Sequence, residues 1–533
     1  MLVTLARLNS ARVTSKKRIN VKVIGLNRNE HFKSKKRMPP LNTFKRSSIA
    51  IALSQAIALP LNAATITVDS ASDTSASNIC ILRDAIEAAN TNMPVAGCVS
   101  GSTVSPNSPD TILFDAGLND QTITLTNGEL PTVITNIAIN GLVSGRSNIE
   151  INGNLQGRIF SIDGGNLSLR NTTLTDAEID LKGGAIHVTS GNLTLTNSTL
   201  TGNSAAEGGA ISAINSSTVT LTNTTLSNNH SRLSGGAINA QNFTSVTLIN
   251  STVSEHSSSR YYGGGIYVAD SSNVNIIDSL ISDNSALDYG GGISIGELSS
   301  VTLTNSTVSG NSAFGNGGGI YAFSSSSLTL IDSTVSGNSA ASNGGGIYSI
   351  GENSVSLNNS TVSGNSALVG GGIDTRFSSN VSLSNSTVSE NSANVVGGIF
   401  ARSESSVSLS NSIIANSVGG GDCNLLGGYV TFDTASIIED GSCGATALVG
   451  DIGLASLANN GGPTQTHALF ANSPARNAGI PSTCATTDQR GNPRQEEAFF
   501  VPIIAANKNI AVVDLGGDDA CDIGAFEFSA SDE

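Results

Sequence analysis

The chain has 533 residues, of which 58 are glycine, none is tryptophan and 4% are aromatic, and its formal net charge is −15. Half of its 26 Lys and Arg residues lie before residue 47 with a single acid, so residues 65–533 carry 13 basic and 40 acidic residues and a net charge of −27. A surface of that charge repels phosphate backbones, which excludes nucleic acid as an expected partner.

The first 64 residues predict a basic leader followed by a secretory signal. An apolar run, Ile49–Leu59, follows Lys45 and Arg46 and leads into small residues. The run is too short to span a bilayer, and its flanks are those of a signal peptide. The basic stretch before it is long for such a signal, so we expect the true start at Met38; a nucleic-acid-binding arm is the alternative. We therefore expect a secreted protein, extracellular or on a bacterial cell surface, with no membrane span once the signal is removed.

Residues 65–131 predict an N-terminal cap. Within them, residues 80–90 form an expected amphipathic helix, because Leu82, Ile86 and Ala89 fall on one stripe. Such a helix is suited to cover the first coil of a repeat structure.

Residues 132–417 repeat one pattern, whose clearest copy is Val301–Ile320. Successive copies are 26 to 28 residues apart, and a fixed period of this size predicts a solenoid. No proline occurs between Pro131 and Pro463, which suits coils whose backbone N–H groups must all pair.

Each copy contains three short pieces in which alternate residues are apolar: Val301 with Leu303, then Val308, then Ile320 after the glycines. This alternation predicts strands. The expected fold is all-β, a right-handed single-stranded parallel β-helix with coils of about 26–27 residues stacked about 4.8 Å apart. The Gly, Ser, Thr and Asn content excludes helical repeats, and the frame of leucine-rich repeats is absent.

A polar residue recurs once per coil, and we expect its side chains to form a structural hydrogen-bonded ladder inside a turn. The ladder residues are Asn171, Asn197, Asn223, Asn250, Asp278, Asn305, Asp332, Asn359, Asn385 and Asn411. A second column lies six residues further on, at Asn203, Asn229, His256, Asn284, Asn311, Asn338, Asn365 and Asn391. N-glycosylation is the alternative explanation for many of these asparagines.

Residues 418–533 predict a separate C-terminal module, and all six cysteines lie outside the repeats. The expected disulfides are Cys80–Cys98, Cys423–Cys443 and Cys484–Cys521, which would clip the irregular end regions in an oxidising compartment, although the sequence leaves the connectivity open. A zinc site is the alternative, but no C-x-x-C pair exists and there are only five histidines. We therefore expect no metal and no cofactor.

Two segments resemble known families. The run from Cys80 to Asn90, which contains Arg83, is similar to the CSLREA motif found near the start of many bacterial surface and secreted β-helix proteins. It departs from the motif at Ile81 and Asp84. The resemblance implies an exported β-helix protein.

Four separated blocks in the C-terminal module resemble the choice-of-anchor Q domain. The blocks are Gly461–Leu469, Ser473–Ala475, Asp488–Gly491 and Cys521–Glu527. This resemblance implies a surface protein of parallel β-helix architecture. The Gly-Gly-x-Ile repeats are also similar, more weakly, to chlamydial polymorphic outer-membrane proteins.

Polysaccharide-cleaving enzymes also use parallel β-helices, and their chemistry needs carboxylates grouped on one face. Between residues 191 and 416 there are only four Arg and no Lys, and the acids scatter over unrelated positions of the coil. The best cluster, Asp374 with Arg376 and Arg402, contains one carboxylate and is explained by solvated turn charges. We therefore assign no catalytic residue.

The position after the repeated Ile is predicted to face outward, and in several coils it is aromatic. Exposed rings at coil spacing would make a strip on which an extended sugar chain stacks. The candidate ligand-binding residues are Tyr267, Tyr321, Tyr348 and Phe400. The alternative is that these rings pack on each other and only favour strand structure.

These observations favour a non-catalytic, adhesin-like rod outside the cell. Extracellular glycans, or other cell-surface or matrix components, are its expected partners. A polysaccharide lyase or glycoside hydrolase on the same scaffold is the alternative hypothesis.

Overall fold

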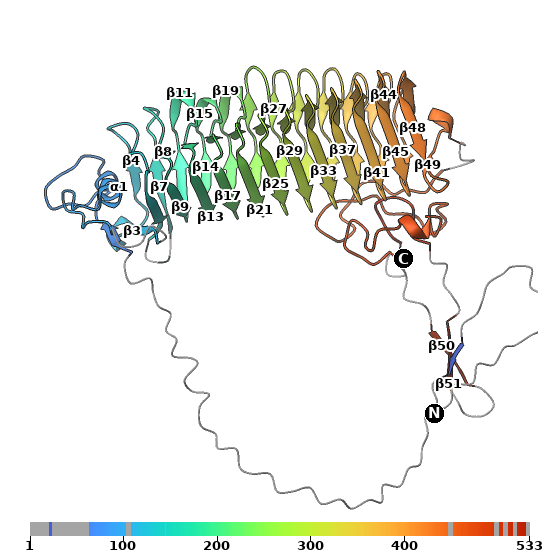
Figure 1. Cartoon of the computed structure of the whole chain (residues 1–533), viewed down its shortest axis with the longest axis horizontal. Helices are drawn as coiled ribbons and strands as arrows, with labels where there is room; N and C mark the ends of the chain where they lie inside the picture. Colours follow the sequence, from blue (N-terminus) through green and yellow to red (C-terminus); the bar gives the residue numbers. More distant parts are fainter. Residues whose placement is uncertain are drawn as a thin grey trace, which may run out of the picture. The chain divides into compact units, whose positions relative to one another are not determined.

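The computed structural model divides the chain into two compact units (Figure 1). The described residues are 21–23, 63–102, 108–143, 145, 147–445, 451–494, 500–504, 510–514 and 520–528. One unit comprises residues 1–55 and 495–519, and its described part is an antiparallel sheet of order β1 (Val21–Val23), β51 (Ile510–Asp514), β50 (Phe500–Ile504). Apart from β1 and residues 63–64, the predicted leader and signal peptide lie outside the described residues.

The other unit, residues 56–494 and 520–533, contains an all-β, right-handed parallel β-solenoid, which confirms the predicted fold class. Four parallel sheets run along it, and the chain of each regular coil visits sheet 1, sheet 2, sheet 3 and sheet 4 in turn. The sequence predicted three strands per coil. The strand it missed belongs to sheet 3 and is often two residues long, as at Ser312–Ala313, which is too short for a periodic signal.

Sheet 1 presents apolar residues to the core and small polar residues to its outer face, as Val301 and Leu303 show in β29. Its 14 strands are β2 (Thr65–Val68), β3 (Asp110–Phe114), β5 (Asn136–Asn140), β9 (Asn166–Arg170), β13 (Asn192–Thr196), β17 (Thr218–Thr222), β21 (Ser245–Ile249), β25 (Asn273–Ile277), β29 (Ser300–Thr304), β33 (Ser327–Ile331), β37 (Ser354–Asn358), β41 (Asn380–Ser384), β45 (Ser406–Ser410) and β48 (Tyr429–Phe432).

Sheet 2 follows the predicted ladder residue of each coil and sends one apolar side chain inward, such as Val308. Its strands are β4 (Thr122–Thr124), β7 (Ser147–Asn152) with β6 (Leu142–Val143) antiparallel to it, β10 (Thr172–Thr175), β14 (Thr199–Thr201), β18 (Thr225–Ser227), β22 (Thr252–Ser254), β26 (Leu280–Ser282), β30 (Thr307–Ser309), β34 (Thr334–Ser336), β38 (Thr361–Ser363), β42 (Thr387–Ser389), β46 (Ile413–Ala415) and β49 (Ile437–Ile438).

Sheet 3 is the shortest layer and begins one residue after the second polar column. Its nine strands are β11 (Glu178–Lys182), β15 (Ser204–Glu207), β19 (His230–Ser234), β23 (Ser257–Ser258), β27 (Ser285–Ala286), β31 (Ser312–Ala313), β35 (Ser339–Ala340), β39 (Ser366–Ala367) and β43 (Ser392–Ala393).

Sheet 4 follows the glycines, and its repeated Ile is fully buried in every regular coil. Its strands are β8 (Phe160–Asp163), β12 (Ile186–Thr189), β16 (Ile211–Ile214), β20 (Ile238–Ala240), β24 (Ile266–Val268), β28 (Ile293–Ile295), β32 (Ile320–Phe323), β36 (Ile347–Ile350), β40 (Ile373–Arg376), β44 (Ile399–Arg402) and β47 (Cys423–Leu426). The glycines are needed because neighbouring coils approach closely: a Cβ on Gly318 would lie 2.4 Å from the backbone of Ser339.

The solenoid extends beyond the limits that the repeat predicted. β2, β3 and β4 lie within the expected N-terminal cap, and β47, β48 and β49 lie past residue 417, yet all six pair in register with strands of the regular coils or with each other. These strands keep the apolar alternation but lack the Asn and Gly residues of the repeat. The repeat pattern in the sequence therefore predicted a shorter solenoid than the structure shows.

The predicted ladder column stands at a corner where every member has a positive φ, from 46° at Asn411 to 56° at Asn171. Its amides bond from coil to coil in the first half of the rod, for example from Asn250 Nδ2 to Asn223 Oδ1 at 2.7 Å. Several of these side chains are exposed, so the column is not enclosed in a turn as expected. From Asp332 onward its members bond to the C-terminal module instead.

The second polar column is the enclosed ladder. Asn311 Nδ2 donates to Asn338 Oδ1 at 2.9 Å, and the backbone N–H of Asn311 donates to the same oxygen at 3.0 Å. The same pair of bonds recurs in the neighbouring coils, and these asparagines are fully or almost fully buried. This column therefore satisfies backbone groups at the corner before sheet 3.

The N-terminal end is covered by α1 (Leu82–Thr91), the helix that the sequence predicted, and Figure 1 shows it at the end of the stack of coils. Leu82, Ile86 and Ala89 are buried, and the Cys80–Cys98 disulfide closes the segment. Arg83 reaches Asp73 at 3.0 Å and the carbonyl oxygens of residues 128 and 129. No helix in the described ranges is long and apolar enough to cross a membrane.

Described residues of the C-terminal module between 464 and 494 and between 521 and 528 pack along sheet 2 of the later coils. The disulfides Cys423–Cys443 and Cys484–Cys521 form within the module, as the sequence led us to expect. It contains the short 3-10 helices η2 (Ser442–Gly444) and η3 (Pro481–Thr483); a third, η1 (Ala116–Leu118), lies near the N-terminal end. After β49, the described residues up to 494 contain no further strand of the solenoid, and hydrogen bonds to the rod hold this segment in place.

Candidate functional site

The outer face of sheet 4 carries the aromatic column together with the cluster of Asp374, Arg376 and Arg402. Each strand of this sheet turns its second and fourth positions away from the core. The register aligns Tyr348 with Asp374 and Asp374 with Phe400, while Arg376 follows two residues after Asp374 on the same face. The aromatic column and the Asp374 cluster are therefore neighbours on one surface.

A third column comes from the residue that precedes the glycines. Tyr262, Tyr289 and Asn316 form successive parallel bridges, and Asn343 continues the column one coil later. The glycine corner folds this segment back over sheet 4, so that the Tyr262 ring stacks on the Tyr267 ring with centroids 5.3 Å apart.

The aromatic side chains form one continuous stack. The Tyr321 ring lies 4.8 Å from Tyr289, 5.1 Å from Phe323 and 5.6 Å from Tyr348, with interplanar angles of 14° to 25°. Offset stacking at these distances is favourable beyond the area buried. The stack therefore stiffens several consecutive coils.

The prediction that the aromatic column forms an exposed strip is wrong. Tyr267, Tyr321, Tyr348 and Phe400 keep only 7%, 8%, 3% and 5% of their surface exposed. Each ring is covered by its neighbours in the stack or by an arginine, which is the packing alternative. Burial accordingly raises the pKa of Tyr348 to about 12, against an opposing effect of Arg376, and raises the pKa of Tyr321 as well.

Beside this stack lies a buried carboxylate between two guanidinium groups. Asp374 has no exposed surface; its Oδ1 accepts a hydrogen bond from Arg402 Nε at 3.2 Å, and its Oδ2 bonds to the Nη2 atoms of Arg402 and Arg376. Burial raises the pKa of Asp374 to about 7, and Arg376 opposes that shift. Asn343 Oδ1 accepts from both arginines, so four polar side chains form one network.

Each arginine of the network also covers a ring. The Arg402 guanidinium carbon lies 4.4 Å from the Phe400 centroid, and that of Arg376 lies 5.3 Å from the Tyr348 centroid. These contacts hold the guanidinium planes against the sheet through cation–π attraction. The sequence explained the same charges as solvated turn residues, whereas the structure buries most of their surface.

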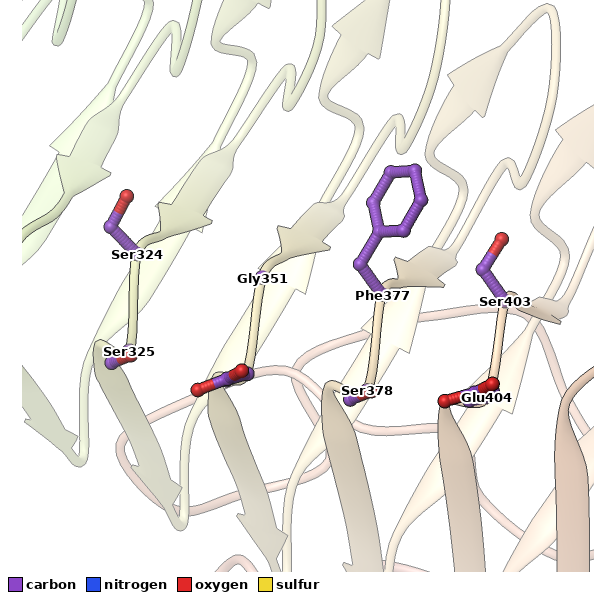
Figure 2. Close-up of a pocket in the computed structure, with 8 residues that line it drawn as sticks. Ser324, Ser325, Gly351, Phe377, Ser378, Ser403 and Glu404 are labelled. Atoms are coloured by element: carbon purple, nitrogen blue, oxygen red, sulfur yellow. The ribbon is translucent and has the colours of Figure 1, made fainter.

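A shallow groove of about 670 Å³ runs along the adjoining turns between sheet 4 and sheet 1. In Figure 2, the side chains of Ser324, Phe377 and Ser403 point the same way from the turns. Glu352 and Glu404 also line the groove and are exposed. The groove thus offers hydroxyl groups, one ring and two carboxylates next to the arginine network.

The arrangement is better suited to binding than to acid–base catalysis. A carboxylate with a pKa near 7 matches a proton-transfer role, but both oxygens of Asp374 are occupied by arginines and none of its surface is exposed. No cluster of three or more His, Cys, Asp or Glu side chains that would hold a metal ion occurs among the described residues.

Sequence reasoning missed Tyr262, Tyr289, Phe323 and Asn343. The signal for three of them was available, because Tyr262, Tyr289 and Asn343 each directly precede the first glycine of their coil. Aligning that position would have revealed the column. Phe323 was missed because only the residue directly after the repeated Ile was aligned.

Comparison with known proteins is consistent with this architecture. The family description "Right handed beta helix region" matches residues 143–307 and 291–447. None of the curated proteins matches the chain in sequence. Among solved structures, the crystal structure of pectate lyase Pel9A aligns with 87% of this chain and 96% of its own, at 14% identity and a TM-score of 0.33, which is too distant to indicate a shared substrate.

Proposed function

The chain belongs to the right-handed beta helix family, and we propose that this member is an extracellular or cell-surface rod that binds an extended glycan along the outer face of sheet 4 without cleaving it. The supporting observation is that this face combines two arginines with accessible surface and a groove lined by hydroxyl groups.

Export is part of this proposal. All six cysteines are paired in disulfides, which favours an oxidising compartment. The strongly acidic composition after residue 64 keeps a long β-surface solvated. The resemblances to the CSLREA and choice-of-anchor Q families point the same way.

A polysaccharide-cleaving enzyme is the second candidate, supported only by the raised pKa of Asp374. Cleavage would require Arg402 and Arg376 to release this carboxylate when a substrate binds. We do not favour it, because the arginines occupy both oxygens of Asp374 and none of its surface is exposed.

The deciding experiment is to incubate the purified full chain with immobilised and soluble polysaccharides, with and without calcium, and to follow retention and product chain length. Retention of at least one polymer at unchanged chain length is the expected result. Shortening of any polymer that disappears in Asp374→Asn would replace the binding function by catalysis, and absence of all retention would remove the glycan proposal.

A further inference from the structure

We propose that the glycan ligand is acidic, and that a carboxylate or sulfate group on one of its sugars is held by the guanidinium groups of Arg376 and Arg402. This inference rests on the proposed function and adds the charge class of the ligand and the residues that recognise it.

Basic residues are rare on this acidic chain, and two of them converge here. Between residues 191 and 416 there are four arginines and no lysine. Arg376 and Arg402 share the single carboxylate of Asp374. Two guanidinium groups share one carboxylate, so the three side chains of this cluster together carry an excess positive charge.

The donor inventory shows that the network is incomplete. A guanidinium has five N–H donors. Arg402 uses Nε and Nη2, and Arg376 uses Nη2, while neither Nη1 atom bonds to any part of the chain that the structure describes. Neither Nη1 is among the enclosed polar atoms without a partner, so both reach solvent and remain available to an acceptor.

Both donors are held in place before any ligand arrives. The Arg402 guanidinium packs on the Phe400 ring and that of Arg376 on the Tyr348 ring. The Nη2 atoms of both arginines also donate to Asn343 Oδ1, which fixes their position. A pre-organised fork loses little side-chain entropy on binding, and guanidinium groups recognise planar carboxylates and sulfate-like oxyanions through paired hydrogen bonds.

The neighbouring groups suit the rest of a sugar. The Asn343 amide donates to Asn316 Oδ1, which extends the polar line one coil further along the rod. On the adjoining turns, Ser403 and Ser378 line the groove. Exposed Glu352 and Glu404 in the same groove repel a second anion, so recognition centres on the arginine pair.

The test compares binding of the purified full chain to dextran sulfate, to polygalacturonate and to unmodified dextran of similar length. We expect retention on at least one anionic polymer, little on dextran, and weakening when salt rises from about 0.05 M to about 0.5 M, because screening shortens the reach of exposed charges. The two anionic polymers distinguish a sulfate from a carboxylate.

The variants are Arg376→Gln and Arg402→Gln, with Arg232→Gln as the matched control. Arg232 carries the same charge but pairs with exposed Asp180 on sheet 3. Each site variant should lose affinity for the preferred anionic polymer by roughly tenfold or more, as expected for removing a charge-assisted contact, while Arg232→Gln behaves like the wild type.

Equal binding of dextran and the anionic polymers, or unchanged affinity in both site variants, would overturn the acidic-ligand inference while leaving a glycan rod in place. Failure to retain any polymer would instead remove the proposed function itself. If a Gln variant does not fold, Arg402→Lys keeps the positive charge beside Asp374 but removes the guanidinium fork, and should reduce affinity for the preferred anionic polymer in a chain that still folds. Unchanged affinity in that variant counts against the inference.

Discussion

Gln489 Nε2 lies 2.8 Å from Thr334 Oγ1, although 155 residues separate them in the chain. The same amide nitrogen also approaches Thr464 Oγ1 at 2.8 Å, and the Gln489 carbonyl accepts from Thr361 Oγ1 at 2.7 Å. One buried side chain of the C-terminal module therefore bridges two successive strands of sheet 2, β34 and β38.

The rest of the module surrounds this contact with buried charge. Arg494 is completely buried and donates to Gly524 O, to Glu527 and to Asn359 of the rod. Burial raises the pKa of Glu527 to about 8, and Asp522 adds to that shift. Thr464, Gln489 and Glu527, from three separate stretches of the module, thus contribute to one polar region that fastens the module to the rod.

Replacing Gln489 by Ala should destabilise the contact between module and rod. The change leaves the buried Thr361 hydroxyl without its acceptor, which costs about 1–3 kcal/mol. The Thr334 and Thr464 hydroxyls keep the bonds that they donate to Gln465 O and Asp332 O. We expect a lower midpoint of thermal unfolding and earlier proteolytic cleavage of the module.

Gln465→Ala is the control, because its side chain is exposed and only its backbone oxygen takes part in the contact. Unfolding of the two variants at the same temperature would show that the Gln489 contacts do not hold the module.

A single His interrupts the enclosed ladder of asparagines. His256 Nδ1 accepts the backbone N–H of Asn229 at 2.9 Å, but its Nε2 is enclosed without a partner. Burial lowers the pKa of His256 to about 4, against opposing hydrogen bonds to Asn229 and Leu226. The neutral ring is therefore favoured in the folded chain.

This lowered pKa predicts acid sensitivity. The stabilisation from a neutral His256 is fully present above the unfolded-state pKa of about 6.5, and it is lost as pH falls toward 4, by on the order of 3 kcal/mol in total. His256→Asn should restore the ladder, raise the unfolding midpoint and flatten its decline between pH 6.5 and 4.

The measurement is the thermal unfolding midpoint across that pH range, with His230→Asn as control. His230 is only half buried, so its lowered pKa reflects weaker desolvation. Parallel pH profiles for wild type and His256→Asn would contradict this account.

The β-solenoid could be predicted from the sequence because the same short-range pattern of inward apolar residues specifies each coil. Buried apolar residues equivalent to Val301, Leu303, Val308 and Ile320 recur in the other regular coils. Because each coil packs on its neighbours in the same way, the repeat period is enough to specify the core of the rod. The disulfides followed for a similar reason, since their partners lie close in sequence on the same cap.

The candidate site did not follow, because exposure on sheet 4 depends on the path of the chain before the glycines. Alternation correctly turned Tyr321 away from the core, but it carries no information on whether Tyr289 folds back over that ring. Likewise, the spacing from Asp374 to Arg402 indicated that these residues lie on adjacent coils, but it did not predict that Asp374 is buried between the arginines. The geometry of the glycine corner before sheet 4 determines which side chains cover an outward-facing residue of that sheet.

The packed stack predicts that Tyr321 contributes more to stability than an exposed ligand-stacking ring would. Tyr321 contacts the rings of Tyr262, Tyr289, Phe323 and Tyr348. Tyr321→Ala removes a buried ring from between coils, and we expect a loss of about 3–5 kcal/mol, in the range seen for large-to-small aromatic changes in cores. Thermal and denaturant unfolding of the purified full chain would measure it.

Tyr261→Ala provides the matched comparison, because that ring is 42% exposed and lies at the margin of the stack, 6.2 Å from Tyr262. Its removal should change stability by well under the loss for Tyr321→Ala, since surface substitutions usually stay within about 0.5 kcal/mol. Equal and small losses in both variants would mean that Tyr321 is accessible in solution, and would return the aromatic column to its role as a strip for stacking sugars. A large loss in Tyr321→Ala alone would leave the arginine pair and the groove as the parts of this face that a ligand reaches.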